Sequence, residues 1–247
     1  MELDRERLEC RRFDVAGTSL CILQDPAASQ SLQPLVAKRE TCVDTQQHAA
    51  ALASQLGGGP LEHVGLVSWQ CGFLLAGYLL TRPPFRQWQD VRVVDLGAGT
   101  GVVGIALALA GADVVLADLP YVTPLTTLNV QANCDLSHHR AAVLDYVWSS
   151  LPTPEELTQP PPDIVTGADL VYDPAAYDDL VGALTALAAP HTLLFLAIKR
   201  RGNDEDVFLS KLAAAGFAVR DVPGAQWGSE YREEGSTYRM VKACKIG

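Results

Sequence analysis

The fold is decided by one stretch of the sequence, Val91-Arg92-Val93-Val94-Asp95-Leu96-Gly97-Ala98-Gly99-Thr100-Gly101-Val102-Val103-Gly104-Ile105-Ala106. Its β-branched start predicts a strand, its glycines predict a tight turn, and its apolar continuation predicts a helix. Glycines permit positive φ angles and let backbone N–H groups approach a ligand closely, and a helix N-terminus adds unpaired donors with partial positive charge. The stretch therefore predicts a site for a nucleotide-like ligand.

The residues around the glycines indicate which nucleotide is bound. The series Gly99-x-Gly101-x-x-Gly104 matches the dinucleotide fingerprint, and Asp118 follows near the usual position of a ribose-binding acid. Asp95 changes this interpretation, because a carboxylate at that strand end would repel a pyrophosphate but suits a ligand with an amine and a sulfonium. We therefore expect S-adenosyl-L-methionine as cofactor and S-adenosyl-L-homocysteine as product, with NAD as the alternative.

Length and charge narrow the class of protein. The 247 residues suit one α/β domain with an N-terminal extension. The formal net charge of −10 argues against a nucleic-acid substrate, because a phosphate polymer is normally met by a basic surface. The same charge suits a protein partner that is basic or neutral. We expect a monomer.

The six cysteines show no C-x-x-C pair and no zinc-ligand spacing, so they predict free buried thiols and no metal site. They are Cys10, Cys21, Cys42, Cys71, Cys134 and Cys244. No apolar run resembles a signal peptide or reaches the length of a membrane span. We expect a cytoplasmic protein that binds no membrane, with the nucleus as the alternative compartment.

Apolar periodicity predicts two regions, an extension over 1–63 and a cofactor-binding domain over 64–247. The extension contains an expected β-hairpin over 11–23 and a helix over 44–56. Five prolines predict an irregular, exposed loop over 149–162. In the domain we expect strands at 91–96, 114–117, 141–144, 163–168, 191–198, 217–222 and 237–244. We expect helices from Ser68 to Pro83, from the glycine turn to Ala110, and over 123–134, 175–189 and 205–215. Ser68 is expected to cap the first of these helices.

The alternation of strands and helices predicts an α/β fold, a parallel sheet with helices on both faces. Ligands in such sheets bind at the carboxyl ends of the strands, and polar or aromatic residues follow four of the expected strands. After the second strand, Asp118 is expected to accept hydrogen bonds from both ribose hydroxyls, or merely to cap the next helix. After the third, Asp145 is expected at the adenine amino group, and either Tyr146 or Trp148 at the adenine face, although each aromatic could equally be a core residue.

The fourth strand is followed by Asp169-Leu170-Val171-Tyr172, the candidate catalytic segment. Methyl transfer to an amine needs a neutral nucleophile, whereas lysine in water has a pKa of about 10.4. Asp169 could hold the arriving ammonium, and Tyr172 could wall an apolar channel in which desolvation lowers the lysine pKa. The alternative is that Asp169 caps a helix while Tyr172 packs in the core.

Two further segments are given weaker interpretations. Trp69 is either a core residue or lies near the methionine end of the cofactor. The basic run Lys199-Arg200-Arg201 is expected to be a solvated loop, because acidic residues follow it closely.

Together these pieces resemble the family 16 protein-lysine methyltransferases, a branch of the seven-strand class I enzymes. The resemblance covers about Gly65 to Lys242. It rests on Gly65-Leu66-Val67-Ser68-Trp69, Leu74-Leu75-Ala76-Gly77-Tyr78-Leu79, Asp95-Leu96-Gly97-Ala98-Gly99-Thr100-Gly101-Val102-Val103-Gly104, Asn129-Val130-Gln131-Ala132-Asn133 and Gly167-Ala168-Asp169-Leu170-Val171-Tyr172. The elongation factor 2 branch and the branch that methylates chaperones and AAA-ATPases are both similar.

The resemblance implies a Rossmann-like seven-stranded sheet and a protein-lysine N-methyltransferase that acts on a protein substrate. It also implies a cofactor site lined by Trp69, Gly97 to Gly99, Asp118, Tyr146 or Trp148, and Ala168. With the residues derived above, the expected cofactor-binding set is Trp69, Asp95, Gly97, Ala98, Gly99, Gly101, Asp118, Asp145, Tyr146, Trp148 and Ala168. The alternatives are a small-molecule or protein-arginine methyltransferase, and a cofactor-binding module without catalysis.

Overall fold

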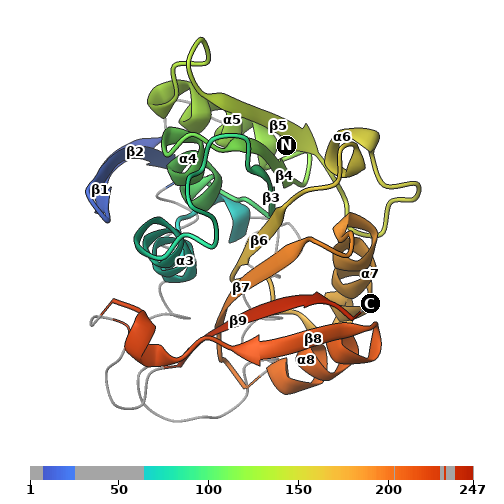
Figure 1. Cartoon of the computed structure of the whole chain (residues 1–247). Helices are drawn as coiled ribbons and strands as arrows, with labels where there is room; N and C mark the ends of the chain where they lie inside the picture. Colours follow the sequence, from blue (N-terminus) through green and yellow to red (C-terminus); the bar gives the residue numbers. More distant parts are fainter. Residues whose placement is uncertain (1–7, 26–63, 203, 229–230, 232–236, 247) are drawn as a thin grey trace, which may run out of the picture.

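The computed structural model describes residues 8–25, 64–202, 204–228, 231 and 237–246, which form a sheet flanked by helices and an additional N-terminal hairpin (Figure 1). The helix expected over 44–56 lies outside the described residues. The division into regions at residues 63 and 64 stays a prediction.

The main sheet has seven strands, as predicted, and their order is β5-β4-β3-β6-β7-β9-β8. The first five strands of that order are parallel, and β9 runs antiparallel to both β7 and β8. The strand order reverses at β3: β4 and β5 are added on one side of it, and the chain then crosses to β6 and β7 on the other side. Such a switch point is where open α/β sheets bind ligands. The bounds are β3 Arg92–Leu96, β4 Asp113–Asp118, β5 Arg140–Asp145, β6 Ile164–Ala168, β7 Leu193–Lys199, β8 Phe217–Asp221 and β9 Tyr238–Lys245.

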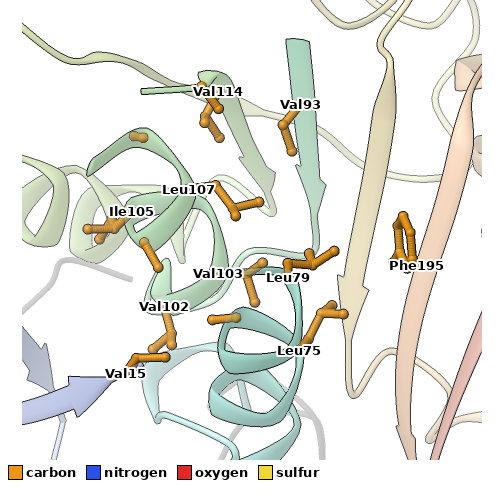
Figure 2. Close-up of a cluster of buried hydrophobic side chains, with 14 of the residues drawn as sticks. Val15, Leu75, Leu79, Val93, Val102, Val103, Ile105, Leu107, Val114 and Phe195 are labelled. Carbon is orange, nitrogen blue, oxygen red and sulfur yellow. The ribbon is translucent and has the colours of Figure 1, made fainter. Parts of the chain in front are cut away.

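Helices cover both faces of the sheet, because its central strands are apolar on both sides. Successive residues of a strand point to opposite faces, so Val93 joins one buried cluster and Val94 the other. Figure 2 shows part of the first cluster, which includes Leu75 and Leu107 of two helices and Val93 of β3. The helices of the first cluster are α3 (Gln70–Thr81), α4 (Val102–Leu109) and α5 (Thr123–Asn133), and those of the second are α6 (Glu155–Thr158), α7 (Tyr177–Leu187) and α8 (Glu205–Ala214).

The predicted hairpin is present as β1 (Glu9–Val15) and β2 (Thr18–Gln24). Ala16 and Gly17 both have positive φ angles, of 52° and 84°, as a two-residue turn between twisted strands requires. The hairpin lies beside the helices of the first cluster (Figure 1), and its apolar side chains are part of that buried cluster.

Two expectations about local structure are wrong. The proline-rich segment contains the one-turn helix α6, because its prolines flank the turn and the buried Leu157 anchors it. Ser68 is not a helix cap, since Trp69 takes the N-cap position and the Ser68 hydroxyl lies 3.0 Å from the Thr100 hydroxyl instead.

The expectation of free thiols is wrong for one pair. Cys10 and Cys21 form a disulfide, because neighbouring strands of the hairpin bring their Cα atoms to 6.2 Å. Cys71 and Cys134 are free and buried, as predicted, and Cys244 is free and half-buried. Within the described ranges, no group of three or more potential ligands could hold a metal ion, and no helix is long and apolar enough to cross a membrane.

Candidate active site

The glycine turn joins β3 to α4 at the carboxyl edge of the sheet. Gly97, Gly99 and Gly101 have φ angles of 60°, 56° and 86°, a region that favours glycine. The Gly101 N–H donates to the Ala98 carbonyl at 2.8 Å, and the Ala98 N–H donates to the Ala117 carbonyl of β4 at 3.2 Å. The turn is therefore fixed by its own backbone and by the neighbouring strand.

The space above Gly97 is closed to any side chain. A Cβ atom built there would overlap Leu170 and would lie 3.5 Å from the Trp148 ring. Leu170 follows β6 and Trp148 follows β5, so the turn is contacted from strands on both sides of β3.

Asp95 is buried beneath the turn, and both of its carboxylate oxygens have protein partners. One oxygen accepts a hydrogen bond of 2.8 Å from the Gly104 N–H of α4, and the other accepts one of 2.7 Å from the Thr166 hydroxyl of β6. Burial raises the pKa of Asp95 to about 6, against the opposing effect of these hydrogen bonds. Asp95 of β3 thus connects its own strand to β6 and to helix α4.

Asp118 ends β4 and lies directly against the turn. Its carboxylate accepts hydrogen bonds from the Gly99 N–H at 2.6 Å and from the Leu119 N–H at 2.7 Å. Burial raises the pKa of Asp118 to about 6, although both hydrogen bonds favour the charged form. In the described part of the chain neither Asp95 nor Asp118 forms an ion pair, so this site carries uncompensated negative charge.

The three residues expected near adenine take different environments. Asp145 is exposed and accepts a hydrogen bond of 2.5 Å from the Thr123 hydroxyl. The Tyr146 ring is buried in the second cluster, and its hydroxyl has no hydrogen-bond partner among the described residues. Trp148 is half-buried and is the aromatic residue that contacts the glycine turn.

The two candidate catalytic residues lie at the end of β6. Asp169 is buried with a φ angle of 63°, and its carboxylate forms two contacts of 2.6 Å with the Arg201 guanidinium. Tyr172 is half-buried, and burial, followed by the charges of nearby residues that include Asp118 and Asp169, raises the pKa of its phenol above the usual value of 10. Ala168, the last residue of β6, packs against the first cluster.

The structure brings Trp69 to the same place from another element. The Trp69 indole N–H donates to the Val64 carbonyl at 2.8 Å, which fixes the ring. The Arg201 guanidinium lies 5.6 Å from the centre of that ring. Trp69, Asp169 and Arg201 therefore form one contiguous group.

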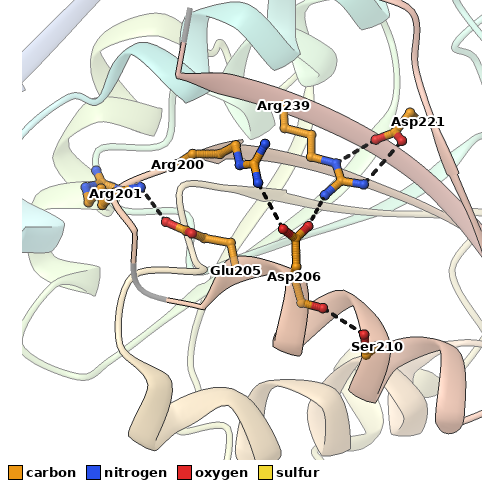
Figure 3. Close-up of polar contacts among 7 residues, drawn as sticks. All are labelled: Arg200, Arg201, Glu205, Asp206, Ser210, Asp221 and Arg239. Atoms are coloured by element: carbon orange, nitrogen blue, oxygen red, sulfur yellow. Dashed lines mark hydrogen bonds and ion pairs between the residues drawn. The ribbon is translucent and has the colours of Figure 1, made fainter.

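Arg201 is the residue that the sequence interpretation missed. The basic run was expected to be solvated, which is wrong for Arg201, because its guanidinium is bound by a buried carboxylate. Arg200 does fit that expectation, since it is half exposed and pairs with the exposed Asp206 (Figure 3). The signal that could have found Arg201 is its place after β7, at the same sheet edge as Asp169.

Comparisons with solved structures place the fold. A TehB-like SAM-dependent methyltransferase from Corynebacterium glutamicum superposes with a TM-score of 0.52 over 81% of this chain and 99% of the other, at 14% identity. The seven-strand sheet with flanking helices is thus the fold of SAM-dependent methyltransferases.

Comparisons with curated proteins give three informative relatives. EEF1A lysine methyltransferase 3 of Xenopus tropicalis is 35% identical over 54% of this chain and 57% of its own length. Protein N-lysine methyltransferase METTL21A of the same organism is 30% identical over 64% of this chain and 71% of its own length. Histone-arginine methyltransferase METTL23 of Xenopus laevis is 31% identical over 47% of this chain and 49% of its own length. The matched regions thus cover little more than half of the first relative, and about half of the last.

A family model described as lysine methyltransferase matches residues 55–215, which include the glycine turn, Asp118 and the segment from Asp169 to Tyr172. Because this match spans more than half of the sequence, the chain belongs to the lysine methyltransferase family.

Proposed function

We propose that the protein is an S-adenosyl-L-methionine-dependent protein-lysine N-methyltransferase. Membership of the family supports the reaction class. The observation that carries the proposal is the pair of carboxylates beside the glycine turn, the buried Asp95 and the half-buried Asp118, with no cationic side chain paired to either among the described residues. A ligand with an ammonium and a sulfonium would supply the missing positive charge.

The cofactor would be held at the carboxyl edge of β3, β4 and β5. Asp118 would accept hydrogen bonds from the ribose hydroxyls, and the proximity of Trp148 to Gly97 supports Trp148 rather than Tyr146 as the wall for adenine. The other proposed contacts are Trp69, Asp95, Gly97, Ala98, Gly99, Gly101, Asp145 and Ala168.

The bound cofactor supplies an electrophilic methyl group on a positively charged sulfur. The chain's own task is to place a neutral amine in line with the methyl–sulfur bond, since methyl transfer needs no strong acid. We propose that Asp169 and Tyr172 shape the acceptor channel. Because the Tyr172 phenol stays protonated well above neutral pH, it would add no negative charge to the channel.

The acceptor is proposed to be a lysine side chain of a protein with a basic or neutral surface. Two of the relatives reported above carry lysine methyltransferase in their names, and one of them names the elongation factor EEF1A. The histone-arginine methyltransferase among the relatives favours one second candidate, arginine methylation on the same fold.

Binding of the cofactor is tested by titration calorimetry. We expect wild-type protein to bind S-adenosylhomocysteine and not NAD. Asp118→Asn should weaken this binding at least about tenfold, because a charged hydrogen-bond acceptor is lost. The matched control is Asp113→Asn at the opposite end of β4, where the half-buried Asp113 contacts Arg92 and Arg140 at 3.9 Å; it should bind as wild type does. Absent binding by the wild-type protein would refute the proposal.

The acceptor is tested by labelling. Protein incubated with tritiated S-adenosylmethionine and a cell lysate should label a protein band, and mass spectrometry should locate the methyl groups on lysine. Methylarginine in that band would establish the second candidate instead. Cofactor binding without any labelled protein or small molecule would indicate a binding module.

We also propose that the protein is a cytoplasmic or nuclear monomer that does not bind nucleic acid. Light scattering after gel filtration, cell fractionation and a gel-shift assay test these three statements in turn. A dimer, a membrane-bound fraction or a shifted nucleic-acid band would each contradict one of them.

A further inference from the structure

Asp169 and Arg201 form a partly buried ion pair in which both carboxylate oxygens contact the guanidinium. The Arg201 Nη1 and Nη2 atoms lie 2.6 Å from the two carboxylate oxygens of Asp169. The exposed fraction of the side chain is 4% for Asp169 and 23% for Arg201. Parallel, charge-assisted hydrogen bonds of this kind combine strength with a defined orientation.

Three further contacts hold Arg201 in this position. Its guanidinium lies over the Trp69 ring, and Nη1 donates a second hydrogen bond, of 3.2 Å, to the Lys199 carbonyl. The backbone N–H of Arg201 donates to the carboxylate of the buried Glu205 (Figure 3). Main chain and side chain are thus both fixed, which distinguishes Arg201 from a solvated basic residue.

The pair decides the charge at the end of β6. Among the described residues, Arg201 is the cationic side chain that contacts the Asp169 carboxylate. The other titratable groups that interact with Asp169 or Arg201 come from several elements, and are Cys71 of α3, Tyr172 after β6, Tyr177 of α7, Glu205 of α8 and Tyr238 of β9. Without Arg201, the buried Asp169 carboxylate would have no cationic partner among the described residues.

We propose that Arg201 is a positioning residue of the acceptor site, which neutralises Asp169 and fixes it together with the Trp69 ring. This inference rests on the proposed function. It also changes the role expected for Asp169, which would act as the anchor of Arg201 rather than as a free carboxylate that holds the acceptor ammonium.

The reaction gives the pair a reason to be neutral. The amine lone pair forms the new nitrogen–carbon bond, the carbon–sulfur bond breaks with its electrons moving to sulfur, and the resulting ammonium loses a proton to water. An unpaired carboxylate would stabilise both the sulfonium reactant and the unreactive ammonium form of the acceptor. Pairing with Arg201 removes this stabilisation of the ground state.

The test compares a charged ligand with a neutral one and needs no acceptor protein. Titration calorimetry at pH 8.5 gives the ratio of affinities for S-adenosylmethionine, which carries the sulfonium, and S-adenosylhomocysteine, which does not. We expect Arg201→Gln to shift this ratio about tenfold toward S-adenosylmethionine, because an unpaired carboxylate attracts the sulfonium at the intermediate dielectric constant of a protein site. Arg201→Lys keeps the charge and should leave the ratio close to that of wild type.

Two controls separate charge from structure. The double variant Asp169→Asn/Arg201→Gln restores neutrality, so its ratio should return to the wild-type value. Arg200→Gln removes the neighbouring, surface-paired guanidinium and should leave the ratio unchanged. Circular dichroism checks that each variant folds. If Arg201→Gln does not fold, the ratios of the two affinities in Arg201→Lys and Asp169→Asn are used in its place. A shift of this ratio in Arg201→Lys, which keeps the charge, would refute the proposal.

The outcomes distinguish this inference from the function on which it rests. Binding of both ligands by folded Arg201→Gln as tightly as by wild type, or loss of the same factor of affinity for both, would show a merely structural role for Arg201. If wild-type protein binds neither ligand, the proposed function and the inference fall together.

Discussion

The buried Asp95 and the half-buried Asp118 give the protein a pH dependence that follows from their pKa values. Both carboxyl groups titrate at about 6 in the folded chain, above the value of 3.8 expected without burial. Keeping them ionised therefore costs stability above pH 6, and protonation removes that cost. A cationic ligand opposes this effect because it favours the ionised form.

We expect the affinity for S-adenosylmethionine to fall as the pH is lowered through about 6. Over the same range, the free energy of unfolding of the ligand-free protein should rise as the pH falls from about 7 to 5, by on the order of 1–2 kcal/mol. Calorimetric titrations and urea unfolding at pH 5, 6, 7 and 8 measure the two quantities. Constant ligand affinity across this range would contradict the assignment of these carboxylates to the site.

At the scale of elements, helix α5 connects the hairpin to the glycine turn. The Asn129 side chain accepts a hydrogen bond from the Leu23 N–H at 2.6 Å, and it donates to the Leu23 and Thr100 carbonyls, each at 2.9 Å. Asn133 makes the corresponding pair of 2.7 Å bonds to Cys21, and its amide also donates to the Asn129 carbonyl at 2.7 Å. The two amides thus pair with β2 as a neighbouring strand would.

Asn129→Ala is expected to lower the free energy of unfolding by about 2–4 kcal/mol, because it removes the side-chain partner of three backbone groups, one buried and two partly buried. It should also weaken binding of S-adenosylhomocysteine several-fold, since Thr100 belongs to the turn. Urea unfolding and calorimetry provide the measurements. Asn133→Ala is the matched control, expected to destabilise the protein without the loss of affinity; equal affinities in both variants would disconnect the hairpin from the site.

At the scale of the whole molecule, the net charge of −10 should affect the binding of the acceptor protein rather than the rate of the methyl-transfer step. A basic protein surface is attracted over distances of about a Debye length, which is ~10 Å in 0.1 M salt. We expect the KM for the labelled acceptor protein to rise several-fold between 50 and 300 mM NaCl, with kcat nearly constant. Initial-rate kinetics at four salt concentrations measure this; a KM that falls with salt would exclude electrostatic attraction.

The sheet and its helices could be predicted because each depends on local pattern. Buried β-branched strands and apolar helices repeat along the chain, and the strand ends place Asp118 and Asp169 at one edge. The partner of Asp169 could not be predicted in the same way, because Arg201 is selected by packing between segments 32 residues apart. The environments of Tyr146 and Trp148 likewise depend on strand twist and on neighbouring side chains, which no single-strand pattern contains.

The pairing of β2 with α5 has a consequence for synthesis. The bonded residues are separated by 106 and 112 positions, so the hairpin leaves the ribosome well before its helical partner exists. Its apolar side stays uncovered until the helices of the first cluster have been made, and the closing of such a long loop carries a high entropic cost. We therefore expect attachment of this hairpin to be a late step in folding, so that the growing chain exposes this apolar surface until then.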